Sequence, residues 1–558
     1  MTKTINQWAL GLCAALTLTG CNTTSGNLAL INGKIYTVNE AQPWAEAVVI
    51  QNEKIIYVGN VEGANPYLND RSKVVDLKGR LVLPGIHDTH LHPLEAGSDR
   101  ITCVLDSEQS LNTNLATLEE CATGNGDEWV LGWGHGLESL LESHVAPKQL
   151  LDNINPNRPI AIMEETSHSV WVNSKALEMA GITANTPHPT GGAILKDANG
   201  NPTGILLDSA GDGIFELAFA PTPELKAINY EGLLYGLSEV AKNGITSIVD
   251  ARVYWQRGYL DAWEKAEKNN TLTARTVLSL WAYPGMNDEE QIAHLKTLYR
   301  NDPESLLRIS QIKFYSDGIL HSSTAALHDP YLEYFDEVGP RGLNYFNKER
   351  LTHYTTELER TGFDMHIHAI GDRGVTESLD AIEAAQTANG KSGRHRITHL
   401  EMITDADKPR FSDLGVIADF QLAGEFTMPE HFSDMESVIG DRAHGMLPVR
   451  EIFDTGATVT LSSDWDVSSL SPFVGMQNAL SRGEQSLPSL AEVIKAYTLN
   501  GAYLMRQENV AGSIEVGKYG DLIIVDQNIF ETPVNKIANT KVLTTLLGGE
   551  IVYGSLNL

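Results

Sequence analysis

Residues 81–93 read LVLPGIHDTHLHP, and this stretch decides how the rest of the chain is interpreted. An apolar run ends at Pro84-Gly85, and His90 and His92 follow with one residue between them. Alternate residues of an extended strand point to the same side, so both imidazoles can bind one metal ion. A single pair of this kind is weak evidence, because most such histidines lie at the surface or in a satisfied core. The pair gains weight from residues farther along the chain.

Apolar segments alternate with helical patterns through the middle of the chain, which predicts a parallel sheet. Eight such segments begin at Leu81, Ile245, Arg275, Arg308, Asp364, His395, Val416 and Thr458. Helical patterns lie between most of them, for example over residues 224–243 and 348–360. Eight units of this kind predict an α/β fold with a TIM-type (β/α)8 barrel, in which chemistry occurs at the C-terminal ends of the strands. An open, doubly wound sheet is the alternative.

Both ends of the chain carry short strand patterns with turn residues between them. Such patterns fill residues 28–76 and recur over residues 512–554. Neither end is long enough for a stable sheet by itself, so we expect one small β-sandwich built from both ends. Asn-Gly at residues 32–33 and Asn-Glu at residues 52–53 lie where hairpin turns belong.

These patterns predict a division into domains. Residues 1–20 form a signal peptide, residues 21–80 and 506–558 form the β-sandwich, and residues 81–505 form the barrel. A long insertion, at about residues 94–225, follows the first barrel strand. We expect this insertion to cap the active site and to select the substrate, because binding residues concentrate in such loops.

Composition limits the classes of partner. The 558 residues are 42% hydrophobic, so the chain can bury a sizeable core. Lys and Arg number 41 against 72 Asp and Glu, which gives a net charge of -31. Such a surface repels nucleic acid and anionic membrane surfaces, so we expect no nucleic-acid partner and no membrane contact except through an N-terminal lipid anchor. We expect a small molecule as the substrate. A homodimer is left open.

The N-terminus has the pattern of an export signal. Lys3 is the only charged residue before an apolar run over residues 8–18, which is too short to span a bilayer but typical of a signal peptide. The run ends in Leu-Thr-Gly-Cys, which resembles the bacterial lipobox, whose cysteine is lipidated. The sequence therefore predicts a lipid anchor at Cys21 and a periplasm-facing place in the bacterial cell envelope. An ordinary cleaved signal peptide is the alternative.

Cysteine usage agrees with an exported protein. Cys13 leaves with the signal peptide and Cys21 carries the lipid, so Cys103 and Cys121 remain. In an oxidising compartment these two residues can form a disulfide, which we state as a hypothesis.

Metal-ligand side chains collect near the predicted C-terminal ends of the barrel strands. They are His90, His92, Lys313, His366, His368, His399 and Asp464. Unrelated core histidines have no reason to gather at one rim of a barrel. The joint pattern therefore predicts a metal-dependent active site, although each residue alone is a weak signal.

Ordered motifs extend the pattern over nearly all of the mature chain. They are LPGIHDTHLH from Leu83, SHSVWVNSKALEMAGI from Ser167, KNGITSIVDA from Lys242, IKFYSDG from Ile312, HIHAIGDRGV from His366, RHRITHLE from Arg394 and SSDWDV from Ser462. In these motifs the chain resembles the amidohydrolase superfamily. Within it, the chain resembles the YtcJ-like branch, also called amidohydrolase family 3, which includes N-substituted formamide deformylases.

The resemblance implies a set of metal ligands. His90, His92, His368 and His399 would bind metal, and Asp464 would bind metal and act as general base on the attacking water. The implied cofactor is one or two divalent metal ions, with zinc as the first choice. Lys313 resembles a lysine that is carboxylated and bridges two metals, and a carbamate requires the neutral amine that burial favours. The alternative is a snorkelling or ion-paired lysine beside a single metal.

The roles of several other positions rest on fewer matches. The family register selects His368 over His366, which would then support the ligands without binding metal. Three residues of the insertion, His168, Trp171 and Asn173, are candidates for substrate binding. For Trp171 and Asn173 the alternative is packing and helix capping. Thr398 replaces a residue that is commonly acidic in the branch, which puts the tuning of the neighbouring ligand in doubt.

The implied reaction is hydrolysis of a carbon–nitrogen bond in an amide, a formamide or a cyclic amide. Deamination of a ring amine would use the same metals and the same base. A non-catalytic binding or regulatory lipoprotein is a third reading, because motif matches alone do not demonstrate turnover. The sequence does not identify the substrate.

Overall fold

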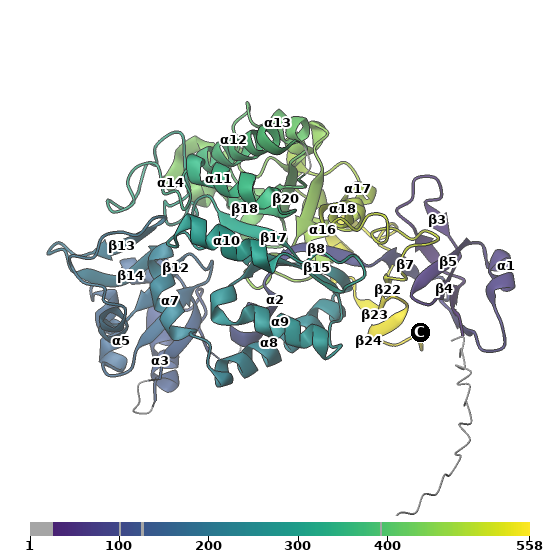
Figure 1. Cartoon of the computed structure of the whole chain (residues 1–558), viewed down its shortest axis with the longest axis horizontal. Coiled ribbons are helices and arrows are strands. Elements are labelled where there is room, and N and C mark those ends of the chain that lie inside the picture. The colour runs from purple at the N-terminus through teal and green to yellow at the C-terminus, as the bar shows by residue number, and fades with distance from the viewer. Residues whose placement is uncertain (1–25, 100–101, 124–127, 391–392) are drawn as a thin grey trace, which may run out of the picture.

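The computed structural model describes residues 26–99, 102–123, 128–390 and 393–558. Figure 1 shows a central barrel, a lobe of strands and helices at one side of it, and a group of short strands at the other side. The barrel supplies most of the largest buried core of the molecule. The predicted signal peptide and Cys21 lie outside the described residues.

Eight parallel strands form the barrel in the order β21-β20-β19-β18-β17-β16-β15-β8. They are β8 (Ile86–Leu91), β15 (Ile245–Val253), β16 (Arg275–Trp281), β17 (Leu307–Tyr315), β18 (Asp364–Ala369), β19 (Arg396–His399), β20 (Ile417–Gln421) and β21 (Val459–Ser462). The two ends of the sheet meet where Asp464 N donates to His90 O at 2.8 Å. The barrel is nearly closed, and the prediction of a TIM-type barrel is confirmed.

Helices cover the outside of the barrel, so its strands are buried on both faces. All nine residues of β15 are buried. The helix before it, α8 (Pro223–Lys242), begins with Thr222, whose side chain accepts from Leu225 N at 3.2 Å. Proline at the first position also favours the start of a helix there. The helical pattern predicted over residues 348–360 is α11 (Lys348–Glu359).

The stretch that begins at Leu81 forms two strands, and the prediction of one continuous strand is wrong. β7 (Leu81–Pro84) joins a different sheet, and the barrel strand β8 begins at Ile86. Gly85 lies between them, where a Cβ atom would approach Thr246 Oγ1 to 2.0 Å. The chain therefore passes from one sheet to the other at the only residue type that fits this close approach.

Two further sheets contain the strands from the chain ends. One has the order β5-β4-β1-β6 and the other β24-β23-β22-β7-β2-β3. Their strands are β1 (Leu28–Ile31), β2 (Lys34–Tyr36), β3 (Trp44–Ala45), β4 (Ala47–Gln51), β5 (Lys54–Gly59), β6 (Lys73–Asp76), β22 (Leu522–Val525), β23 (Val542–Leu547) and β24 (Glu550–Gly554). Leu30 of the first sheet and Ile524 of the second belong to one buried cluster. Strands from both ends of the chain thus share a sheet and a core.

The two predicted hairpin turns have different outcomes. Asn52 and Glu53 both have positive φ, 48° and 66°, and connect the antiparallel strands β4 and β5 as expected. The turn at residues 32–33 is not a hairpin, because β1 and β2 belong to different sheets. The Asn-Gly pair instead leads the chain from one sheet to the next.

The insertion after the first barrel strand has its own sheet, in the order β13-β14-β12-β11-β10-β9. Its strands are β9 (Cys103–Val104), β10 (Val130–His135), β11 (Ile160–Glu164), β12 (Ser169–Val172), β13 (Gly192–Lys196) and β14 (Pro202–Asp208). Its helices include α3 (Leu111–Cys121), α5 (Pro147–Ile154), α6 (Ser174–Met179) and α7 (Asp212–Ala218). A disulfide joins Cys103 to Cys121 and so ties β9 to α3. In Figure 1 this sheet lies on the opposite side of the barrel from β4 and β5.

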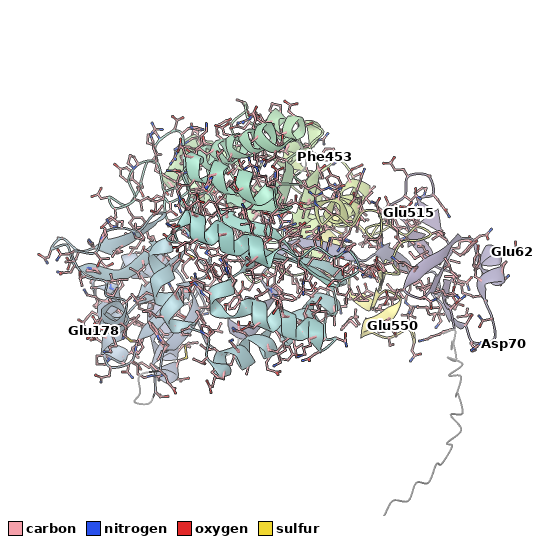
Figure 2. The ribbon with its side chains drawn as sticks, viewed as in Figure 1. Glu62, Asp70, Glu178, Phe453, Glu515 and Glu550 are labelled. Atoms are coloured by element: carbon pink, nitrogen blue, oxygen red, sulfur yellow. A yellow bond between two sulfur atoms is a disulfide. The ribbon has the colours of Figure 1, made fainter. Side chains whose placement is uncertain are left out.

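The acidic side chains lie largely on outer elements. Figure 2 labels Glu62, Asp70, Glu178 and Glu550, which are exposed on elements far from the centre of the barrel. Solvated carboxylates of this kind account for a strongly negative net charge without a special site. Among the described residues, no helix is both long and apolar enough to cross a membrane.

Candidate metal centre

The ligand-type side chains converge inside the barrel at the C-terminal ends of its strands. They come from β8, β17, β18, β19 and the segments that follow β8 and β21, and are His90, His92, Lys313, His366, His368, His399 and Asp464. Most of them are completely buried, and the Asp464 side chain is 15% exposed. Parallel strands bring residues distant in sequence to one rim, which is why these side chains meet.

Asp464 faces the two histidines of the first barrel strand. Its Oδ1 lies 3.1 Å from His92 Nε2 and 3.3 Å from His90 Nε2. Its Oδ2 lies 3.8 Å from His399 Nδ1. One ligand atom from each of His90, His92 and Asp464 lies within 4.8 Å of the others, close enough for all three to hold one ion.

Two of these residues have unusual backbone conformations. His399 has φ 75° and Asp464 has φ 56°, in the left-handed region that residues other than glycine seldom adopt. Such conformations persist only where the surrounding structure enforces them, and they concentrate at functional sites. Here they turn the chain at the strand ends so that both side chains face the barrel axis.

Burial keeps the histidines neutral. It holds the pKa of His90, His368 and His399 well below 6.5, so each ring keeps a lone pair at neutral pH. Burial also acts to raise the pKa of Asp464, but the charge and hydrogen bonds of the facing histidines outweigh it and hold that pKa well below 3.8. Neutral imidazoles around an ionised carboxylate are the donor set that zinc and its neighbours prefer.

His368 presents one free ring nitrogen. Its Nε2 lies 3.1 Å from Gly318 O, to which it donates. Its Nδ1 is buried and has no hydrogen-bond partner in the part of the chain that the structure describes. The ring also lies 4.5 Å from the His399 ring, centroid to centroid. A metal-binding histidine commonly donates its other N–H to a carbonyl, so this arrangement fits a ligand that binds through Nδ1.

Lys313 lies at the bottom of the centre and is fully buried. Its Nζ is 3.4 Å from His90 Nε2 and 3.4 Å from His366 Nε2. Burial holds the pKa of Lys313 well below 10.5, against the attraction of Asp464. These two histidines are its polar contacts among the described residues, and the choice between a carboxylated and an ion-paired lysine stays a prediction.

His366 points its Nε2 toward His90 and Lys313, and its other ring nitrogen is hydrogen-bonded on the far side of the ring. Its Nδ1 accepts from Arg396 Nη2 and lies 3.1 Å from Ser279 Oγ. His90, His366 and Asp419 form a second group whose ligand atoms lie close together. Asp419, however, already accepts from the hydroxyl groups of four residues, at 2.9 to 3.4 Å. They are Thr89, Thr398, Thr460 and Ser462.

His168 reaches the centre from the insertion. Its Nδ1 donates to Asp208 Oδ1 at 2.6 Å, and Tyr345 Oη donates to the same oxygen at 2.8 Å. The His168 ring stacks on Tyr315 of β17, with centroids 5.3 Å apart, and lies 5.2 Å from the His368 ring. His168 directly precedes β12 and Asp208 is the last residue of β14. These neighbouring strand ends thus place a histidine and its carboxylate partner at the mouth of the barrel.

Trp171 and Asn173 make their contacts within the insertion. Trp171 is fully buried, and its Nε1 donates to Pro147 O at 2.7 Å. Asn173 begins α6, where its side chain accepts from Ala176 N at 2.9 Å. These contacts are those of packing and helix capping, the alternative that the sequence left open.

Sequence reasoning missed four polar residues of the centre. They are Asp208, Tyr345, Arg396 and Asp419. A signal existed for two of them, because an arginine and an aspartate inside buried barrel strands need polar partners. No periodicity links Asp208 or Tyr345 to the barrel mouth, since both belong to irregular segments or to the insertion.

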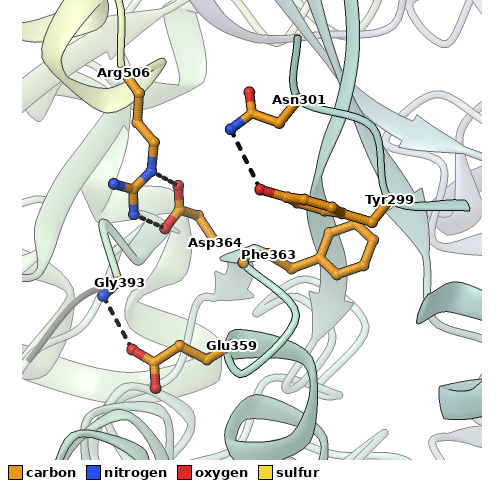
Figure 3. Close-up of a pocket in the computed structure, with 8 residues that line it drawn as sticks. Tyr299, Asn301, Glu359, Phe363, Asp364, Gly393 and Arg506 are labelled. Atoms are coloured by element: carbon orange, nitrogen blue, oxygen red, sulfur yellow. Dashed lines mark hydrogen bonds and ion pairs between the residues drawn. The ribbon is translucent and has the colours of Figure 1, made fainter. Parts of the chain in front are cut away.

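A separate pocket of about 240 Å³ lies at the other end of the barrel strands (Figure 3). Its lining includes Tyr299, Glu359 and Asp364, which lie at or before the starts of β17 and β18, and Arg506, which follows α18 (Leu499–Leu504). Figure 3 shows the paired contacts between Arg506 and Asp364 and between Gly393 N and Glu359. Its charged groups are paired, and none of the predicted ligands lines it.

Comparisons with known proteins show which family and which solved structures this chain is similar to. A model of a family described as the amidohydrolase family matches residues 73–553. A putative amidohydrolase, YtcJ, from Bacillus subtilis is 28% identical over 93% of this chain and 98% of its own. An N-substituted formamide deformylase from Arthrobacter pascens is 26% identical over 94% of this chain and 98% of its own. The crystal structure of an uncharacterized metal-dependent hydrolase from Pyrococcus horikoshii superposes with a TM-score of 0.71 at 23% identity. It covers 91% of this chain and 99% of that one.

Proposed function

The chain belongs to the amidohydrolase family, and from that premise we propose that it hydrolyses a carbon–nitrogen bond in an amide, a formamide or a cyclic amide. Membership makes it a metal-dependent hydrolase. The observation that carries the proposal is the buried set of neutral histidines around the ionised Asp464 at the barrel rim. The relative named as an N-substituted formamide deformylase supports the bond type but does not identify the substrate.

The donor set divides into two neighbouring groups. We propose that His90, His92 and Asp464 hold one divalent cation, and that His368 and His399 hold a second. Zinc is the first choice, because imidazole nitrogens and one carboxylate suit its coordination. Divalent cations in such sites supply Lewis-acid chemistry, which acidifies water and polarises a carbonyl group.

Lys313 would join the two groups as a carbamate. Only a neutral amine reacts with carbon dioxide, and burial favours that form of Lys313. Among the described residues, the polar contacts of its Nζ are the rings of His90 and His366, which supports an amine that is available to react. The resulting carbamate is an oxygen ligand with one negative charge.

Asp464 would move the proton. Its carboxylate is ionised at neutral pH, so it can accept a proton from the attacking water and return it to the departing nitrogen. His168 would contact the substrate from the insertion, since its ring lies beside the His368 ring. For Trp171 and Asn173 we adopt packing and helix capping.

The protein's place in the cell also belongs to the proposal. We propose export through the signal peptide at residues 1–20, lipidation at Cys21 and a periplasm-facing lipid anchor. The disulfide between Cys103 and Cys121 supports an oxidising compartment. We further propose that the two sheets of the chain ends form one β-sandwich, since they share a buried cluster. The domain boundaries and a homodimer stay predictions.

A product assay tests the reaction. The metal-loaded protein is incubated with N-alkylformamides, N-acyl amines, cyclic amides and ring amines, and the products are identified. We expect an amine and a carboxylate, with turnover lost on chelation and regained with zinc. Ammonia from ring amines alone would favour the deaminase. No turnover on any member of the panel by protein that carries metal would favour a binding lipoprotein.

A further inference from the structure

His366 is the buried histidine of the centre that the two proposed cation-binding groups leave without a role. It lies on β18, two residues before the proposed ligand His368. Its Nδ1 accepts from Arg396 Nη2. A guanidinium can only donate, so Nδ1 carries no proton, and the proton of the neutral ring is on Nε2. His366 therefore presents an N–H, and not a lone pair, to the interior of the centre.

The Nε2–H of His366 has two neighbours. His90 Nδ1 lies 3.1 Å away and Lys313 Nζ lies 3.4 Å away. His90 Nδ1 also lies 3.0 Å from Thr398 Oγ1, which accepts from Gln421 Nε2 at 2.8 Å. When His90 gives its Nε2 lone pair to a cation, its proton is on Nδ1 and is donated to Thr398. His90 then cannot accept from His366, and the group carried by Lys313 is the remaining acceptor.

Arg396 places a positive charge behind this contact. Its side chain is 1% exposed, and its Nε and Nη1 have no hydrogen-bond partner within the described ranges. The nearest carboxylate pairing, from Nε to Asp419 Oδ2, is 3.9 Å long. A buried cation that is this weakly compensated is costly unless a negative charge forms nearby. Lys313 is where such a charge can form.

We propose that His366 is a positioning residue for the carboxylation of Lys313. Its Nε2–H donates to the carbamate, and Arg396 fixes the tautomer and adds positive charge from the far side of the ring. This inference rests on the proposed function, in which Lys313 carries a carbamate. It also explains why His366, Arg396 and Ser279 are adjacent, although none of them faces the cation-binding atoms of Asp464.

The chemistry of the step balances without a further reagent. The lone pair of the neutral Lys313 amine attacks the carbon of carbon dioxide, and a nitrogen–carbon bond forms. One carbon–oxygen π pair moves onto oxygen, and the amine loses one proton to water. The side chain changes from neutral to singly negative, which is the change in charge that His366 and Arg396 stabilise.

Two variants of His366 distinguish a side chain that donates a hydrogen bond from one that only fills space. Glutamine places an amide N–H near the position of Nε2, whereas leucine fills similar volume and cannot donate. Each metal-loaded protein is equilibrated with increasing ¹³C-bicarbonate, and the carbamate signal is measured by ¹³C NMR with metal content alongside. We expect His366→Leu to need about tenfold more bicarbonate or higher for half-occupancy, since hydrogen bonds to charged groups are strong. His366→Gln should stay within about threefold of wild type.

A matched control removes another buried barrel histidine. His395 precedes β19, and its Nε2 pairs with Glu359 at the opposite end of the strands. His395→Leu should leave carbamate occupancy unchanged. If His366→Leu titrates like wild type, the inference is overturned while the carboxylated lysine stands. If the wild type shows no carbamate at any bicarbonate concentration, the carboxylation in the proposed function fails and the role of His366 fails with it.

A second measurement needs no variant. In a crystal structure of the wild-type protein grown with bicarbonate, we expect His366 Nε2 within hydrogen-bond distance of the carbamate on Lys313. A longer distance, or a metal ion on His366 Nε2, would overturn the inference even if His366→Leu failed to fold.

Discussion

Asp464 is the residue on which the proposed proton transfer depends. An asparagine at this position would keep the shape and one oxygen but could not accept a proton, so we expect Asp464→Asn to lower kcat by about 10²–10⁴-fold. The fold and most of the metal should remain. The measurement is the rate of amine release by the metal-loaded variant. Glu62→Gln, a change at an outer position, should leave the rate unchanged, and a near wild-type rate for Asp464→Asn would show that another group is the base.

Glu359 gives a prediction about pH. Burial acts to raise its pKa, but hydrogen bonds from His395 and Asn389 outweigh burial and lower the pKa from 4.5 to about 2. A depressed carboxyl pKa stabilises the fold above the unfolded value and loses that effect as pH falls toward the folded value. We expect the stability difference between wild type and Glu359→Gln to be constant above pH 4.5 and to shrink between pH 4.5 and about 2.

Urea unfolding at a series of pH values would measure this difference. Glu349→Gln is the control, because it removes a carboxylate near the start of the same helix and leaves the contact between Glu359 and His395 in place. A difference that stayed constant down to pH 2 would mean that the Glu359 contact does not depress the pKa.

The convergence of the candidate ligands was predictable where residue type and strand position act together. His90, Lys313 and His399 lie in the last residues of their strands, and His92 and Asp464 lie just after strand ends. A barrel brings strand ends to one rim whatever the detailed packing. Arg396 and Asp208 were not predicted as parts of the centre, because their roles depend on which neighbour each side chain meets. That choice is made by strand register and by the path of the insertion, neither of which a sequence pattern specifies.

At the scale of elements, Gly85 separates the barrel from the sheet of the chain ends. A methyl group there would lie within 2.7 Å of three side-chain atoms of Thr246, so either strand would have to move. We expect Gly85→Ala to destabilise the protein by about 1–3 kcal/mol, as overpacking commonly does. The measurement is denaturant unfolding followed by circular dichroism.

Gly285→Ala is the matched control for this prediction. Apart from the two neighbours of Gly285 in the chain, no atom of the described residues lies within 4 Å of the added Cβ position, and the residue does not require positive φ. The control should shift stability by no more than about 0.5 kcal/mol. Equal effects at the two positions would mean that the close approach to Thr246 does not constrain the chain.

Element types were easier to predict than element partners. The eight barrel strands and the helices near residues 223–242 and 348–359 were evident, because alternating apolar strands and amphipathic helices differ in period. The change of sheet at Gly85 was not evident, because the end of the apolar run at Pro84-Gly85 does not show that the residues on its two sides join different sheets. The turn at residues 32–33 was also misassigned, because Asn-Gly favours a tight turn but does not specify which sheet the next strand joins.

In the whole molecule, the candidate metal centre and the ion-paired pocket lie at opposite ends of the barrel strands. The candidate metal centre lies at the C-terminal ends of the barrel strands, where the insertion contributes His168. The pocket with Asp364 and Arg506 lies at the opposite ends. This separation lets loops and insertions set specificity without disturbing the barrel, which is the general logic of the fold.

The most direct test of the central claim is the metal content of the purified protein, measured per chain by elemental mass spectrometry in the presence of bicarbonate. Two neighbouring groups of donors joined by Lys313 predict about two divalent ions per chain for wild type and a loss of metal in Lys313→Ala. A short carboxylic acid added to that variant should restore part of the metal. No bound metal in the wild-type protein, even after reconstitution with zinc or manganese, would contradict the account.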